Sequence, residues 1–299
     1  MRSKREPCVQ VKTHAQLAFM WAAGQAVAAA LQAAAEAVAP GVSTAELDAV
    51  ARARIAGAGA VPSFLGYHGF PAAICTCIND EIVHGIPSAS RVLQEGDVVS
   101  IDCGASVEGW HADAALTVGV GTIPARLAKL IADCERALWQ GLAAARAGAR
   151  LSDISYAVER SARAAGEYGI VEDYVGHGIG SEMHMDPPVP NYGRPGRGPV
   201  LAEGMALAIE PLLVLGSPET RLLDDGWTVV SEYGGWSAHF EHTVAITAAG
   251  PWVLTASAGP SAGTVAAGQV IVRDAAPIRQ SHPSGNRTRP AEEVALHGQ

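Results

Sequence analysis

Residues 98–120 read VVSIDCGASVEGWHADAALTVGV and place two acids in otherwise apolar sequence. A run with the composition of a buried strand ends in Asp102, and Asp113 stands just before a second such run. Two more acids have the same setting, because Glu210 follows an apolar run and Glu241 precedes one. A buried ionised carboxylate costs several kcal/mol unless it is paired or bound to a cation, so these acids need partners.

Basic side chains are scarce near these acids. The nearest in sequence are Arg91, Lys129 and Arg221, and none stands regularly beside an acid. For a single acid, a salt bridge or a capped strand end is the ordinary explanation. Four acids that converge would repel one another, and a pair of divalent metal ions is the natural way to neutralise them, since hard carboxylates suit Mn, Fe, Co or Zn.

Histidines give a second signal. His177 lies in the run Gly-His-Gly-Ile-Gly, His184 follows seven residues later, and His84 lies in residues 79–85, Asn-Asp-Glu-Ile-Val-His-Gly. A lone histidine is usually a hydrogen-bonded structural residue, but glycines on both sides remove bulk and allow a close approach. The glycine-rich run does not open a helix, which argues against a dinucleotide-binding loop.

Composition limits the class of protein. The chain has 299 residues, of which 48% are hydrophobic and 17% charged, so it can bury a large core and is not a disordered chain. The net charge of −9 argues against a general nucleic-acid binder. Five cysteines without a C-x-x-C pair argue against a disulfide framework or a cysteine-rich zinc site and favour a reducing compartment.

Helical and strand-like patterns alternate along the chain, which predicts an α+β fold. The uncharged run 15–35 could be a signal peptide or a membrane span, but its large apolar residues share one face while Gln25, Gln32 and Glu36 lie on another, which favours a soluble amphipathic helix. A capping box at Ser43 starts a second helix. Further helices are expected after Pro124 and over 152–166, and strands at 98–102, 116–120, 205–209 and 244–247. The chain as a whole is expected to divide into a polar arm over 1–12, a catalytic region over 13–257 and a flexible tail over 258–299.

Taken together, the motifs of residues 13–255 resemble those of type I methionine aminopeptidases of peptidase family M24. The segments that carry the resemblance are Asn79-Asp80-Glu81 with His84-Gly85-Ile86-Pro87, Ser100-Ile101-Asp102, His111-Ala112-Asp113, Gly176-His177-Gly178-Ile179-Gly180, Ile209-Glu210-Pro211 and Phe240-Glu241-His242-Thr243. The steps of eleven residues between the two aspartates and seven between the two histidines also fit this family. There is no long helical insertion between His184 and Glu210, which disfavours the type II subclass.

This resemblance implies the pita-bread fold, in which two pseudo-symmetric halves surround a curved antiparallel sheet. It also implies two divalent metal ions, Co, Mn, Fe, Zn or Ni, with the physiological metal left open. Asp102 and Asp113 would hold one ion, His177 and Glu210 the other, and Asp113 and Glu241 would bridge them. The implied activity is removal of the initiator methionine by metal-activated water, with a small residue in second position.

Roles for the neighbouring residues follow from the same resemblance. Glu210 would move the proton of the attacking water, His184 would stabilise the oxyanion and His84 would lie near the leaving nitrogen. Phe64, Phe70 and Met183 depart from the usual pattern, which leaves the substrate preference open. The expected lining of the methionine pocket is Tyr67, Phe70, Cys75, Met183 and Trp227, with His84 and His184 at its mouth.

Two other readings remain at this level. A peptidase that cleaves before proline has the same fold but usually carries a large amino-terminal domain, and little precedes the first helix here. A non-catalytic binding module generally loses ligands, whereas all five are present. The expected partners are nascent polypeptides with N-terminal methionine in the cytoplasm, bound by a monomer. Association with the ribosome is left open, and no membrane or nucleic-acid motif is evident.

Overall fold

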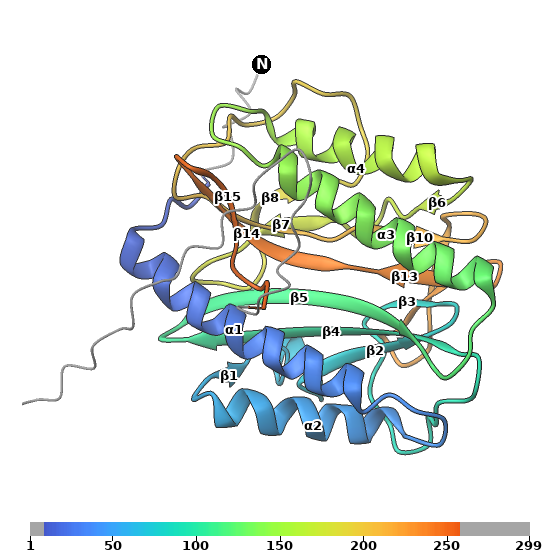
Figure 1. Cartoon of the computed structure of the whole chain (residues 1–299). Helices are drawn as coiled ribbons and strands as arrows, with labels where there is room; N and C mark the ends of the chain where they lie inside the picture. Colours follow the sequence, from blue (N-terminus) through green and yellow to red (C-terminus); the bar gives the residue numbers. More distant parts are fainter. Residues whose placement is uncertain (1–8, 258–299) are drawn as a thin grey trace, which may run out of the picture.

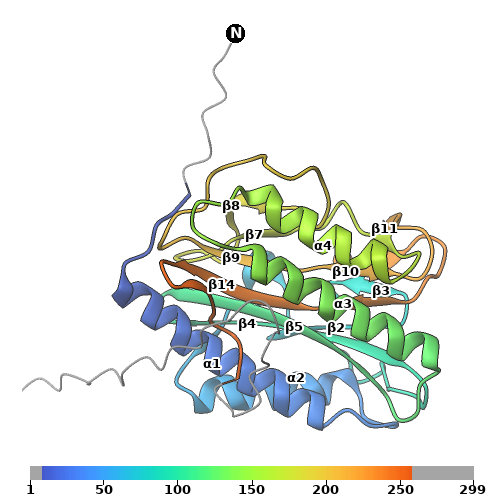
Figure 2. The same ribbon diagram turned by 45° about the horizontal axis from the view of Figure 1, so that its top comes forward.

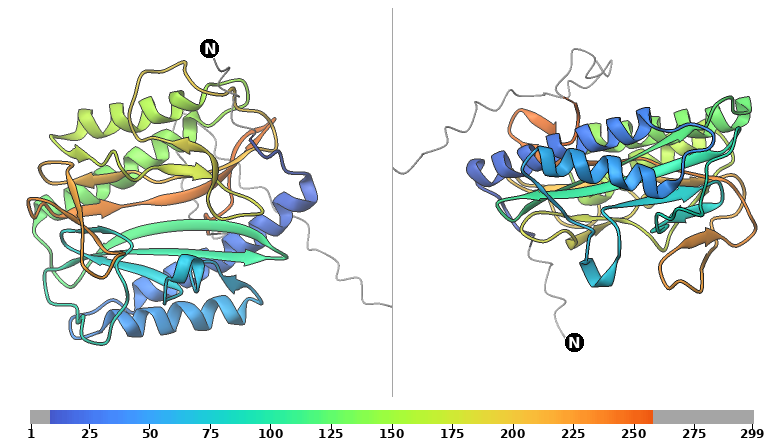
Figure 3. Two further views of the ribbon diagram at one scale, coloured as in Figure 1. Left: turned by 180° about the vertical axis from the view of Figure 1, so that it is seen from behind. Right: turned by 90° about the horizontal axis from the view of Figure 1, so that it is seen from below.

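The computed structural model describes residues 9–257, in which four helices lie on one face of a nine-stranded antiparallel sheet (Figures 1 and 3). The predicted α+β class is therefore confirmed. The first eight residues of the predicted arm and the predicted tail over 258–299 lie outside the described residues. The helices are α1 (His14–Glu36), α2 (Thr44–Gly57), α3 (Ala125–Ala144) and α4 (Leu151–Ala165).

The order of the large sheet brings strands distant in sequence together. It runs β1-β4-β5-β14-β9-β7-β8, with β2 also paired to β4 and β15 to β14. Two small three-stranded sheets, β13-β10-β6 and β11-β12-β3, complete the fold. The strands are β1 (Val61–Pro62), β2 (Ile74–Ile78), β3 (Glu81–Val83), β4 (Val98–Val107), β5 (Trp110–Gly119), β6 (Gly169–Ile170), β7 (Gly176–Gly178), β8 (Met185–Val189), β9 (Ala206–Ile209), β10 (Leu212–Val214), β11 (Thr220–Leu222), β12 (Val229–Ser231), β13 (Ser237–His239), β14 (Glu241–Thr247) and β15 (Gly250–Val253).

Each half of the molecule contributes a helix pair followed by strands of the large sheet, which are long in the first half (β4 and β5) and shorter in the second. The pair α1–α2 packs on β2 and β4 through one buried apolar cluster, and α3–α4 packs on β9 and β14 through another. Figure 2 shows α3 and α4 over the β7–β9 side of the sheet and α1 and α2 over the β4–β5 side. Because the helices cover one face, the opposite face and its loops are left to form a site.

Helix α1 is a core helix of this fold. By length and composition alone it could cross a membrane, but half of its most apolar stretch is buried in the protein. Gly24 lies so close to the chain after β15 that a Cβ would be 2.3 Å from the carbonyl oxygen of Leu254. Gln25, expected on the polar face of this helix, is half-buried, and its amide donates to the carbonyls of Leu254 and Ala256.

Helix α2 begins at the capping box that the sequence predicted. The hydroxyl of Ser43 accepts from the Glu46 amide, and the Glu46 carboxylate accepts from the amide of Ser43. Val50 on this helix is only half-buried, whereas Asp48 is buried. The Oδ1 atom of Asp48 accepts from the backbone amides at the start of β2, so this acid joins the helix to the sheet.

We predict that Asp48→Ala destabilises the protein by about 2–4 kcal/mol, because it leaves the buried amides of Ala73 and Ile74 without an acceptor. Urea unfolding followed by circular dichroism measures this change. Asp48→Asn keeps one acceptor oxygen and should cost clearly less. Equal losses in the two variants would show that the charge of Asp48, rather than its acceptor atom, matters.

Candidate metal centre

Strands from both halves of the fold supply the four acids. Asp102 lies in β4 and Asp113 in the adjacent β5, with Asp102 opposite Ala115 in the register. Glu241 begins β14 and is also paired with Ala115, while Glu210 directly follows β9. The sequence placed Asp102 at the end of a strand and Asp113 before one, but both lie inside longer strands. Because side chains alternate along a strand, this register turns Asp102 and Asp113 to the same face.

All five expected ligands line a single cavity of about 150 Å³, together with every residue expected in the pocket. Its polar side consists of acids and histidines, and its other side is apolar. The basic residues nearest in sequence pair elsewhere: Arg91 with Glu81, Lys129 with Asp133 and Arg221 with Glu232. The cavity is lined by Asp102, Asp113, His177, Glu210, Glu241, His84, His184, His239, Phe64, Tyr67, Phe70, Cys75, Val83, Met183 and Trp227.

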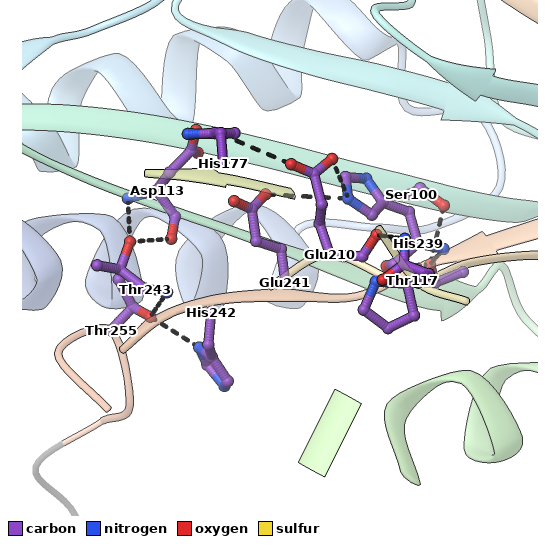
Figure 4. A network of polar contacts seen from close by, with 12 residues as sticks. Ser100, Asp113, Thr117, His177, Glu210, His239, Glu241, His242, Thr243 and Thr255 are labelled. Carbon is purple, nitrogen blue, oxygen red and sulfur yellow. Dashed lines mark hydrogen bonds and ion pairs between the residues drawn. The ribbon is translucent and has the colours of Figure 1, made fainter. Parts of the chain in front are cut away.

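The ligand atoms of this cavity are close enough to share metal ions. One oxygen each of Asp113 and Glu241 and a nitrogen of His177 lie within 4.8 Å of one another (Figure 4). The Nε2 atom of His177 is 3.6 Å from Oε1 of Glu210. Two donors about 2.1 Å from a common ion lie roughly 3–4 Å apart, so this spacing fits a metal centre.

His177 is oriented by its own backbone and by close neighbouring strands. Its Nδ1–H donates to the carbonyl of Gly178 at 2.9 Å, which leaves the lone pair on Nε2 facing Glu210. The glycines around His177 do allow a close approach, and the group that approaches is the backbone of a neighbouring strand. A Cβ on Gly176 would lie 2.3 Å from the carbonyl oxygen of Ala208 in β9. Burial also lowers the pKa of His177 to about 4, so the ring is neutral near pH 7.

Burial and mutual repulsion act against the charged forms of the acids. Burial raises the pKa of Asp113 to about 7, and burial together with Asp113 raises the pKa of Glu210 to about 8. The same causes raise the pKa values of Asp102 and Glu241 well above their ordinary range. Atoms of Asp102, Asp113 and Glu241 are also buried without a hydrogen-bond partner. Unpaired buried oxygens and raised pKa values are what a cation would relieve, so these residues fit divalent metal.

Two threonines hold β5 and β14 in register at the site. The Thr243 hydroxyl donates to the carbonyl of Asp113 and accepts from its amide, so the backbone of this acid is held on both sides (Figure 4). Thr255 in turn accepts from the Thr243 amide and contacts Nδ1 of His242. The strand pairing and these hydroxyls position the acids before any ligand is bound.

Two further histidines, His184 and His84, flank the metal-ligand side of the cavity. Nδ1 of His184 is 3.0 Å from the hydroxyl of Tyr67, and its ring centroid is 4.3 Å from that of His177. His84 has a left-handed backbone, with φ of 61°, and lies edge-on to Tyr174 and Trp227. Burial lowers the pKa of His184 to about 3 and also lowers that of His84, so both rings are neutral at pH 7.

The apolar wall beside the acids is a separate small cluster of aromatic and sulfur-containing side chains. Phe70 lies edge-on to both Phe64 and Trp227, at centroid distances of 6.5 and 5.1 Å. Cys75 and Met183 complete the buried part of this cluster, and Tyr67 borders it. Aromatic rings and sulfur atoms make this wall suited to contact with an apolar side chain.

The comparisons with known proteins agree with this geometry. Residues 18–248 match the pattern of metallopeptidase family M24. The chain belongs to this family. It is 52% identical over 252 residues to methionine aminopeptidase 1 of Mycobacterium tuberculosis, an alignment that covers 83% of this chain and 95% of the relative. The resemblance that the motifs indicated is therefore confirmed.

Comparison with solved structures identifies the fold of this M24 metallopeptidase. A methionine aminopeptidase from Thermotoga maritima superposes with a TM-score of 0.81 at 38% identity, covering 83% of this chain and 99% of that one. A Xaa-Pro dipeptidase from Bacillus anthracis superposes with a TM-score of 0.66 at 24% identity, covering 83% of this chain and 62% of that one, a likeness of fold alone. The predicted pita-bread fold is confirmed by these neighbours.

Two residues that line the cavity of this M24 metallopeptidase, Val83 and His239, were missed from the sequence. His239, at the end of β13, is buried and points toward Glu210 and Glu241 (Figure 4). The motif was taken to begin at Phe240, so the histidine before it was not considered. Its spacing gave a signal: residues two apart in an extended segment share a face, and His239 stands two before Glu241.

The raised carboxyl pKa values predict how the stability of the metal-free protein depends on pH. With pKa values of about 7 for Asp113 and 8 for Glu210, the folded protein binds more protons than the unfolded chain above pH 6.5. Its stability therefore falls as the pH rises from about 6.5 to about 8, by about 1–3 kcal/mol. Below pH 6.5, buried neutral histidines such as His177 give the opposite slope.

Thermal unfolding of chelator-treated protein across this pH range measures the effect. Saturating Mn²⁺ should remove most of the fall, because a bound cation stabilises the charged carboxylates. Glu210→Gln should reduce the slope in the metal-free protein. A melting temperature that stays level or rises from pH 6.5 to 8 without metal would contradict the proposed cause.

Proposed function

We propose that this metallopeptidase is a methionine aminopeptidase, which removes the N-terminal methionine of peptides and nascent proteins whose second residue is small. The observation that supports this most directly is the joining, in one cavity, of five ligand-type side chains and an apolar pocket. The high identity to a methionine aminopeptidase over most of both chains supports the same substrate.

Metal binding is assigned residue by residue in this proposal. Asp102 and Asp113 would hold one divalent ion and His177 and Glu210 the other, with Asp113 and Glu241 contributing to both. When bound, two such ions lower the pKa of a water toward neutrality and polarise the scissile carbonyl. The ions are Mn, Fe, Co, Zn or Ni, and the donors do not choose among them.

In this proposal, side chains of the protein accept the proton of the attacking water and stabilise the negative charge that develops on the substrate oxygen. Glu210 accepts the proton of the attacking water, because its carboxylate borders the cavity where that water must lie. The Tyr67 hydroxyl donates to Nδ1 of His184, which leaves Nε2–H free to donate to the oxyanion. His84 lies on the same cavity and serves the leaving nitrogen.

The apolar wall selects the first residue of the peptide. Tyr67, Phe70, Cys75, Met183 and Trp227 surround the methionine side chain. The thioether contacts aromatic rings and sulfur, which are favourable neighbours for it. Phe64 occupies part of the same wall and narrows it.

Partners and location follow from the substrate. Nascent chains emerging from the ribosome are the expected source of N-terminal methionine, and they are met in the cytoplasm. The acidic net charge of −9 favours contact with the peptide rather than with ribosomal RNA. The enzyme acts as a monomer in this proposal, because both metal positions are supplied by one chain.

We predict that Asp113→Asn and Glu241→Gln each lower kcat by about 10³-fold or more, because each removes a bridging carboxylate worth several kcal/mol of transition-state stabilisation. Release of methionine from Met-Ala-Ser, with and without chelator, measures this. Glu203→Gln changes an exposed acid and should leave turnover unaltered. Unchanged turnover in Asp113→Asn, or faster hydrolysis of Ala-Pro-Ala than of Met-Ala-Ser, would refute the proposed function.

A second prediction tests whether His184 stabilises the transition state or binds the substrate. His184→Ala should lower kcat by about 10²–10³-fold with little change in KM, because it removes a donor to the oxyanion. Tyr67→Phe should lower kcat less, since the ring of His184 remains but loses its fixed tautomer. A rise in KM with unchanged kcat in His184→Ala would instead assign this residue to substrate binding.

A further inference from the structure

His239 is a buried imidazole that the five-ligand scheme does not use. Its side chain is 3% exposed and lies on the wall of the metal cavity. Nε2 is fully buried and has no hydrogen-bond partner. A buried nitrogen without a partner costs about 1–3 kcal/mol, so the atom needs a function in the complete site.

The two nearest acidic groups do not satisfy this nitrogen by hydrogen bonding. Nε2 of His239 is 3.9 Å from Oε2 of Glu210 and 3.9 Å from Oε2 of Glu241, beyond hydrogen-bond distance. The three side chains offer ligand atoms that all lie within 4.8 Å of one another. Two donors on one ion can be up to about 4.2 Å apart, so both 3.9 Å distances are short enough for His239 to share a cation with either acid.

The backbone fixes where this imidazole points. The Thr117 hydroxyl donates to the carbonyl of His239 at 2.7 Å and accepts from its amide at 2.9 Å. Ser100 donates to the same Thr117 oxygen, which adds a support from β4 (Figure 4). His239 is therefore clamped to the central strands, as ligands of preorganised metal sites are.

Charge balance favours a neutral donor at this position. The acids Asp102, Asp113, Glu210 and Glu241 supply four negative charges, which two divalent ions balance. A fifth carboxylate would add repulsion, whereas an imidazole adds a lone pair without charge. Glu210 faces His177 with one oxygen and His239 with the other, so it lies between two nitrogen donors.

We propose that His239 is a sixth metal-ligating residue of this centre, which binds through Nε2 to an ion shared with Glu210 and Glu241. The proposal rests on the dinuclear site of the proposed function and goes beyond its five ligands. A second imidazole shifts preference toward ions that favour nitrogen, such as Zn, Co, Ni and Fe, over Mn and Mg. The residue thus bears on which metal the enzyme selects.

The test counts metal-bound imidazoles directly. The full chain, labelled with ¹⁵N-histidine and stripped of metal, is titrated with Zn²⁺ and followed by NMR. Two imidazoles should acquire the nitrogen shift of a zinc ligand. One should be absent in His239→Gln and the other in His177→Gln. In a competition with a chromogenic chelator, His239→Gln should bind Zn²⁺ about 10–100-fold more weakly and lose less affinity for Mn²⁺.

The control is His242→Gln, which changes a neighbouring histidine whose Nδ1 contacts Thr255. It should retain both shifted imidazoles. A single shifted imidazole that persists in His239→Gln would overturn the inference while leaving the proposed function intact. Weaker Zn²⁺ binding in His239→Gln without a zinc shift at His239 would overturn it too, because the residue would then only orient the acids. A wild-type chain that binds no Zn²⁺ would refute the proposed function itself.

Discussion

Repulsion among four buried carboxylates is the constraint on which the rest of this structure depends. Asp102, Asp113, Glu210 and Glu241 share one small cavity, and burial alone favours their protonated forms. The hydrogen bonds between strands and the two apolar clusters beneath the helices supply the free energy that keeps these carboxylates together. The fold holds together carboxylates whose repulsion bound divalent metal would relieve, and this couples metal binding to stability.

The position of the cavity follows from how the two halves of the sheet meet. Asp102 and Asp113 belong to the β4–β5 hairpin, whereas Glu210 directly follows β9 and Glu241 begins β14 in the second half. The ladder between β5 and β14 joins these pairs, and Thr243 fixes it at Asp113. Each half supplies only part of the ligands, so the centre exists only in the assembled sheet and is held by strands rather than by loops.

The sequence indicated the start of α2 and the acids that meet in one cavity, because both leave strong local signals. The capping box at Ser43 marked the start of α2, and acids in apolar runs marked four residues that line this cavity. Contacts between distant segments were not predictable in this way. Asp48 is buried because amides of β2 approach it, and Gln25 is tied to the chain after β15. His239 was missed for the same reason, since only the assembled site leaves its nitrogen without a partner.

Acids and aromatic residues divide the cavity into two parts with different physical demands. The polar side needs charge balance and fixed donor angles, and it is built on paired strands. The apolar side needs only volume and contact, and Phe64, Phe70 and Trp227 meet this need by edge-on packing. A substitution at Phe64 can therefore alter which substrate side chain the apolar wall accepts without disturbing the acids and histidines of the polar side. A change of histidine on the polar side would instead alter the set of donor atoms available to a metal ion, and with it the preference among ions.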